Sequence, residues 1–281
     1  MEYTNEQRLK MIEDALGMNR TKVAAHIPIL GPKDYQNPPK LLPIKEGTFP
    51  VKGAGVDDPT HYIFLQGRDF GNLSYNYPHL LVHVTKIGQD ISWQRTQTIL
   101  APNHMLTMRQ FADFMALLYS GNVLDSDGKP LSRMKIAEVQ RDIFDGGEWL
   151  DAMFVQENNA PHYSQKMHWD HKYLSQGVAW KEGLIEPHLR GKTQSRLSSE
   201  ANFDLLDWAN NSTVQGLPPE NVAKGTAGFV SYKFAKLDFE PRVAAFEGKT
   251  STGEKLLRCN YSSKAEFPDI GVRIVKVVTN D

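Results

Sequence analysis

The sequence predicts an α+β fold, because its helix signals lie in the middle of the chain and its strand signals lie towards both ends. Capped amphipathic segments at 107–121 and 132–144 are the helix signals. Short runs of β-branched and aromatic residues at 61–67, 79–86 and through 228–278 are the strand signals. Helices that are grouped together, and do not alternate with strands, favour an α+β arrangement over one built from βαβ units.

Composition bounds the class of protein. A chain of 281 residues can form one large domain or two ordinary ones with a substantial core. Its formal net charge of −1 gives no basic surplus for nucleic acid or anionic membranes, so no nucleic-acid partner is expected. Cys259 is the only cysteine, which excludes an internal disulfide. No apolar run approaches the roughly 18 residues of a membrane-spanning helix, and we expect a soluble chain.

The N-terminal end, "MEYTNEQRLK", is polar and has no apolar core of a signal peptide. The sequence leaves the location of the protein open. Display at the cell surface and export without a recognisable signal peptide are both compatible with it.

The first 60 residues read as an extension of the main domain. Residues 4–17 have the spacing of a short helix that stops at Gly17. Seven prolines follow between 28 and 59, and such a segment can be neither a helix nor a central strand. The sequence therefore predicts an N-terminal helix and proline-rich connector over 1–60 and the main domain over 61–281.

The clearest helix is "LTMRQFADFMALLYSGN". Thr107 and Gln110 have the spacing of a capping box, and Gly121 is a natural stop. A shorter helix is expected at 203–211.

Two further segments complete the regular structure. In the helix predicted at 132–144, Met134, Val139 and Ile143 lie near one face. Residues 90–100 are interpreted as a third strand of the N-terminal half.

Histidines in "PHYSQKMHWDHKYL" are the best metal candidates. His168 and His171 are three residues apart, close enough on a helix to share an ion, with His162 and Asp170 nearby. They would suit a metal-dependent hydrolase, the alternative function from the enzyme class. A structural or solvent-exposed role for the histidines is favoured, since this short spacing is common.

Other chemical signals favour plain structural roles. "LDSDGKPLS" (124–132) opens like a calcium loop but has Ile136 at the twelfth position, where Glu is needed, so an ordinary Asp-Gly turn is favoured. Cys259 beside Leu256 and Leu257 is typical of a small core filler. No nucleophile elbow, phosphate loop or dinucleotide fingerprint occurs. We therefore expect no enzymatic activity and no cofactor.

A polar stretch at 258–266 lies between two apolar segments near the end of the chain. Tyr261 stands among Asn260, Ser262 and Ser263, the mixture found in antibody recognition loops. In such loops the aromatic ring supplies rigid contact area and the small polar residues supply adaptable hydrogen bonds. The stretch is therefore compatible with a recognition loop and equally with an ordinary one.

Five blocks in the second half of the chain carry a family resemblance. They are "GEWLDAMF" (147–154), "LLDWANNSTVQGLPPENVAKG" (205–225), "RVAAF" (242–246), "LLRC" (256–259) and "IGVRIVKV" (270–277). In this order they resemble the variable proteins of archaeal diversity-generating retroelements, the AvpA-like group of Nanoarchaeota. "LTMRQFADFM" resembles the helix that opens the formylglycine-generating-enzyme type of C-type lectin fold.

This resemblance implies a C-type lectin-like fold whose variable region covers about 229–278. It implies a ligand-binding protein whose partner is a protein or glycan, such as one on another cell surface. The formylglycine-generating enzymes use two cysteines and this chain has one, which favours a non-enzymatic binder. Residues expected to vary and to bind ligand are Tyr232, Arg242, Arg258, Asn260, Tyr261, Ser262, Ser263 and Asp269.

Physical reasoning leads to the same expectation. Surface substitutions usually change stability by less than about 0.5 kcal/mol, whereas core substitutions cost several times more. Residues meant to vary should therefore point outward from a frame that others hold. The frame is expected from Leu256, Leu257, Val272, Ile274 and Val275. A structural or virion protein that assembles with copies of itself is a third hypothesis.

Overall fold

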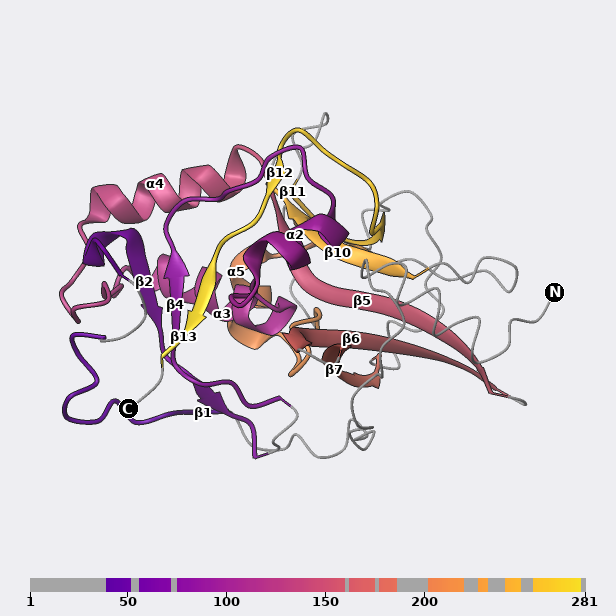
Figure 1. Ribbon diagram of the computed structural model, residues 1–281, viewed down its shortest axis with the longest axis horizontal. Helices are drawn as coiled ribbons and strands as arrows, with labels where there is room; N and C mark the ends of the chain where they lie inside the picture. Colours follow the sequence, from indigo (N-terminus) through magenta and orange to yellow (C-terminus); the bar gives the residue numbers. More distant parts are fainter. Residues whose placement is uncertain are drawn as a thin grey trace.

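The computed structural model is an α+β protein with mostly antiparallel sheets (Figure 1). It describes residues 39–51, 56–71, 75–159, 162–174, 177–185, 202–219, 227–231, 241–248 and 255–278. The helix expected at 4–17 lies outside these ranges. The α+β class predicted from the sequence is confirmed.

A small sheet joins the two ends of the described chain. Its strands are β2 (Tyr62–Leu65), β4 (Leu80–His83) and β13 (Val275–Val277), all antiparallel, with β4 in the middle. Figure 1 shows β13, in yellow, alongside the purple β4. Beside them, β1 (Lys40–Leu41) pairs with β3 (Arg68–Asp69). The last strand is therefore held by strands formed some 190 residues earlier in the chain.

An eight-stranded sheet forms the second half. Its order is β7-β6-β5-β10-β11-β9-β8, with β12 paired to β5. The bounds are β5 (Gly147–Asn159), β6 (His162–Leu174), β7 (Gly177–Leu184), β8 (Asn202–Phe203), β9 (Ala227–Ser231), β10 (Arg242–Glu247), β11 (Lys255–Ser262) and β12 (Ile270–Gly271). β10 and β11 are antiparallel neighbours near its centre.

Four α-helices occur in the described residues, together with the short 3-10 helix η2 (Pro59–His61). They are α2 (Trp93–Leu100), α3 (Met108–Ser120), α4 (Arg133–Phe144) and α5 (Leu205–Asn211). α3 begins at the capping box read from the sequence: the Thr107 side chain accepts from the Gln110 amide, and the Gln110 side chain accepts from the Thr107 amide. Gly121 ends it at φ 71°, in the left-handed region that glycine adopts without strain.

Apolar clusters cover both faces of the central strands. On one face, Phe246 of β10 meets the rings of Phe111 from α3 and Trp208 from α5. On the other face, Trp149 of β5 belongs to a second cluster that includes Trp93 of α2. Strands buried on both sides leave little room for side chains that face solvent.

The segment at 90–100, predicted as a strand, forms helix α2 instead. The Ser92 side chain accepts from the Arg95 amide and caps the helix. Its buried positions, Trp93, Thr96, Gln97 and Leu100, follow the spacing of a helix face. Two of these residues are polar, and that hid the helical period from a reading based on apolar residues alone.

A second correction concerns α4. Met134, expected on its inner face, is 74% exposed, and Ile136 takes that place beside Val139 and Ile143. Two of the three residues predicted for this face are therefore confirmed, and Ile136 replaces Met134 as the third.

Arg273, from the closing "GVR" block, is fully buried and joins four parts of the fold. Its Nε donates to Oε2 of Glu148 on β5 at 3.0 Å, and its Nη2 donates to Oδ2 of Asp142 on α4 at 2.6 Å. Its Nη1 donates to the carbonyl oxygens of His83, the last residue of β4, and of Val84, which follows it. Burial raises the pKa of Glu148, although Arg273 and Lys86 act to lower it. The Arg273 guanidinium therefore connects both sheets to helix α4.

Replacing Arg273 by Met should destabilise the protein by about 3–5 kcal/mol, because it leaves the Glu148 carboxylate buried without its cation. Urea denaturation followed by circular dichroism measures the change. Arg133→Met, at an exposed position on α4, is the matched control and should change the free energy of unfolding by less than about 0.5 kcal/mol. Equal effects of the two substitutions would contradict the assignment.

Candidate functional site

The residues predicted to bind ligand lie mainly on strand β11, and not in a loop. β11 extends through Ser262, and its partner Arg242 starts β10. Arg258, Asn260 and Ser262 are partly exposed, whereas the residues between them are buried. Tyr232 lies outside the described residues.

Tyr261 is packed inside, and the expectation that it points outward is wrong. It is 8% exposed. Its ring centroid lies 4.6 Å from that of Phe267 and 5.5 Å from that of Trp149. Ser263, only 3% exposed, is a second correction, and its carbonyl oxygen accepts from the Gln94 amide of α2 at 3.0 Å.

A β-bulge explains the position of Tyr261. Arg258 pairs with Ala245 and Tyr261 pairs with Val243. Between these two pairs β11 has two residues and β10 has one. Side chains three apart on β11 therefore share a face, and the Arg258 guanidinium lies 5.6 Å from the Tyr261 ring centroid. Tyr261 therefore packs in the cluster on the opposite face of the sheet from Leu257 and Cys259.

The remaining candidates have different surroundings. Arg258 Nε lies 3.2 Å from Glu247 Oε2, and burial raises the pKa of Glu247 although Arg258 opposes it. Oδ1 of Asn260 is buried and has no hydrogen-bond partner within the described chain. Asp269 is exposed, and its carbonyl oxygen accepts from the Gly147 amide at 2.7 Å.

The "QGLP" block forms a tight joint between α5 and α3. Gly216 has a φ of 82°, and a Cβ there would stand 2.2 Å from the backbone nitrogen of Arg109. Its carbonyl oxygen accepts from Nε1 of Trp208 at 2.9 Å. Leu217 follows in the core. Only glycine fits this approach, so the block holds the fold together.

Arg109 adds charge to the same joint. It forms an ion pair with Asp113, which also accepts from the Tyr77 hydroxyl at 2.6 Å and pairs with Arg68 at 2.9 Å. Burial, and then the charge of Asp113, raise the pKa of Tyr77 well above its usual value. Nη1 of Arg109 donates to the Ser212 carbonyl oxygen at 2.7 Å.

The histidines of β6 lie on a strand, so the expected helical approach of His168 and His171 is wrong. His171 bonds Asp151 of the "EWLDA" block, while His168 lies 3.3 Å from Glu182. The Trp180 ring is 5.3 Å from the His168 ring and 6.1 Å from the His171 ring, between centroids. Each histidine therefore has its own carboxylate.

No group of three or more His, Cys, Asp or Glu side chains in the described chain is placed to share a metal ion. The side chain of His162 lies outside the described part. The hydrolase hypothesis therefore stays an untested prediction.

Glu182 has two partners on this strand pair, the Lys166 ammonium group and the His168 imidazole. Burial alone would raise its pKa, but hydrogen bonds from His168 and Lys166 lower the pKa of Glu182 to about 2. Lys166 Nζ is 3.0 Å from its Oε1. For His168 burial dominates and lowers the pKa, so the ring is favoured in its neutral form.

Two other sequence interpretations can be compared with the structure. Oδ1 of Asp125 accepts from the amides of Asp127 and Lys129, both at 2.9 Å, and Gly128 has a φ of 79°. This is the geometry of an ordinary Asp-Gly turn, as expected. Cys259 is buried in the core, and burial raises its pKa, which makes the thiol unreactive.

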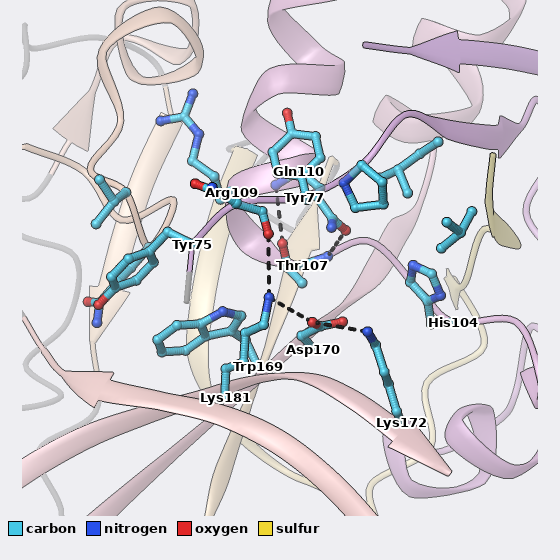
Figure 2. Close-up of a pocket in the computed structure, with 16 residues that line it drawn as sticks. Tyr75, Tyr77, His104, Thr107, Arg109, Gln110, Trp169, Asp170, Lys172 and Lys181 are labelled. Carbon is cyan, nitrogen blue, oxygen red and sulfur yellow. Dashed lines mark hydrogen bonds and ion pairs between the residues drawn. The ribbon is translucent and has the colours of Figure 1, made fainter. Parts of the chain in front are cut away.

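One cavity stands out near the start of α3, and sequence analysis did not single it out. It has a volume of about 140 Å³. Figure 2 shows Trp169 and Tyr75 on one side, Thr107 and Gln110 of the helix cap on another, and Lys172 and Lys181 meeting at Asp170. Its residues come from segments more than 100 positions apart, so no local motif marks it.

Fold and site together define the class as an α+β protein with a large, mostly antiparallel sheet and a small antiparallel sheet that the last strand, β13, completes. Comparison with protein families, with curated proteins and with solved structures found no match. Among the described helices, none has the length and apolar character needed to cross a membrane.

Substituting Tyr261 by Ala should destabilise the protein by about 3 kcal/mol, because it removes a ring packed against Trp149 and Phe267. Arg258→Ala on the same strand should cost less than about 1 kcal/mol, since its ion pair is partly exposed. Urea denaturation of both variants measures the difference. If Tyr261→Ala proved as mild as Arg258→Ala, the tyrosine would not be part of the core.

Stability should fall as the pH drops below the ordinary pKa of histidine. The folded state lowers the pKa of His168. Above pH 6.5 the ring is neutral in both states, so it costs no stability. Below pH 6.5 the unfolded chain takes up a proton that the folded chain does not, and the free energy of unfolding falls. His168→Gln should flatten the decline between neutral pH and mildly acidic pH, by at most about 1.4 kcal/mol per pH unit. Denaturation across this window tests it, and an unchanged slope would exclude His168 as a contributor.

Proposed function

We propose that the chain is a ligand-binding variable protein of a diversity-generating retroelement, built on a C-type lectin-like frame. The observation that carries the proposal is the alternation on β11: partly exposed Arg258, Asn260 and Ser262 are separated by buried residues. Strand neighbours on both sides hold the backbone of β11 in place. Side chains at these positions can change while the frame is kept.

The resembling blocks support the proposal, because each supplies a buried anchor. Glu148 of "EWLDA" meets Arg273 of "GVR", and Gly216 of "QGLP" meets the start of α3. A constant frame around a variable surface requires residues whose role is purely structural.

Burial reduces the number of residues that we propose to vary. Tyr261 and Ser263 are buried and no longer belong to this set. The residues that remain in it are Arg242, Arg258, Asn260, Ser262 and Asp269. Asn260 suits variation especially well, since its Oδ1 has no partner that a substitution would orphan within the described residues. A protein or glycan stays the proposed partner class.

Two matched libraries test the proposal. One randomises Arg258, Asn260 and Ser262, and the other randomises the buried neighbours Leu257, Cys259 and Tyr261. Display on yeast with protease challenge should leave most members of the first library folded and few of the second. Selection of the first library on an immobilised protein, lysozyme for instance, should enrich specific binders.

Equal loss of folding in both libraries would overturn the proposal, and so would a folded first library that yields no target-dependent binder. The coding region gives an independent check. A reverse transcriptase gene and a near-copy of the 3′ segment, differing opposite template adenines, should lie close to it.

A further inference from the structure

The cavity beside α3 is large enough for a small organic molecule. Its volume of about 140 Å³ is close to that of an engineered cavity of about 150 Å³ that binds benzene. It lies at the junction of α3, the β6–β7 hairpin and the segment before β4. Apolar contact comes from Tyr75 and Trp169, whose rings stack with centroids 5.1 Å apart and planes at 15°.

Cationic groups outnumber carboxylates at its mouth. Lys181 and Lys172 both pair with the same Oδ2 of Asp170, at 3.0 and 3.5 Å. Burial lowers the pKa of His104, another lining residue, so that ring adds no charge at neutral pH. Arg109 also lines the cavity but is paired with Asp113. Asp170 is thus one carboxylate shared by two ammonium groups, and the charge beside it is suited to an anionic ligand.

Asp170 is held in this position by an unusual backbone. Its φ is 55°, and it lies where the pairing of β6 with β7 shifts between Trp169 and Lys172. Such irregularities re-aim side chains and are frequent beside binding sites.

A buried acceptor in the lining is unused. Gln215 is 3% exposed, and its Nε2 donates to the Leu184 carbonyl oxygen at 2.9 Å. Its Oε1 is buried with no hydrogen-bond partner in the described part of the chain. Orphaned acceptors of this kind are rare and need an explanation, such as a ligand that donates to them.

The side-chain amide of Gln215 lies next to the aromatic pair. A methyl group added at Gly183 would meet the Tyr75 hydroxyl at 2.8 Å, Nε2 of Gln215 at 3.1 Å and the Trp169 ring at 3.2 Å. The amide, the hydroxyl and the indole therefore converge on one glycine. The lining of the cavity therefore offers a ligand a hydrogen-bond acceptor, cationic side chains and an aromatic surface.

We infer that this cavity binds an α-amino or α-hydroxy acid with an apolar side chain. The ligand carboxylate takes the free donors of Lys181 and Lys172, its amino or hydroxyl group donates to Gln215 Oε1, and its side chain packs against Trp169. No lining residue belongs to β10 or β11. This inference therefore stands or fails independently of the proposed function.

Ligands with one carbon skeleton test the inference on the full chain. A thermal-shift screen of the protein amino acids and their α-hydroxy analogues comes first. Titration followed by tryptophan fluorescence then compares L-leucine and L-2-hydroxy-4-methylpentanoate with 4-methylpentanoate, which lacks the donor, and L-leucinamide, which lacks the carboxylate. The first two should bind, and each of the last two should bind at least about tenfold more weakly.

Two lysine variants serve as a matched pair. Lys181→Met should weaken L-leucine binding at least about tenfold, whereas Lys135→Met, on α4 outside the cavity, should leave it unchanged. A flat screen would overturn the inference, and so would equal binding of all four leucine analogues or equal losses in the two variants. Should Lys181→Met fail to fold, the analogue series on the unmodified protein decides alone.

Discussion

Buried Arg273 is the constraint on which the rest of the structure depends. Its guanidinium contacts carboxylates from β5 and α4 and the backbone that follows β4. A charge without water is tolerable only where its donors are satisfied, so those elements must come together around it. β13 then docks on β4, and the last part of the chain closes the small sheet. Closure of this kind joins residues 62–83 to residues 275–277.

That closure fixes the surroundings of β11. With one apolar cluster on each face of the central strands, only Arg258, Asn260 and Ser262 are partly exposed between Leu256 and Ser262 of β11. Ala245, opposite Arg258, is a small neighbour, whereas Ser262 lies opposite Arg242. Packing against the neighbouring strands therefore decides which side chains reach solvent, and polarity in the sequence does not.

The sequence predicted the elements whose signals are local. α3 follows from its capping box and terminal glycine, and β2 and β4 follow from their β-branched and aromatic runs. Prediction failed where contacts with residues distant in the sequence determine the local structure. α2 buries polar Thr96 and Gln97, and the bulge on β11 turns Tyr261 inward. The cavity beside α3 draws on segments too far apart for any spacing to reveal.

Two irregular features lie together in the cavity lining. They are the Asp170 backbone on β6, at φ 55°, and Oε1 of Gln215 after α5, which has no hydrogen-bond partner among the described residues. Each costs stability that only well-packed surroundings can offset. Substitutions on β11 that cost a further fraction of a kcal/mol stay tolerable only if the anchors at Glu148, Gly216 and Arg273 are unchanged. Under the proposed function, constancy of these anchors is therefore the physical condition for variation at Arg258, Asn260 and Ser262.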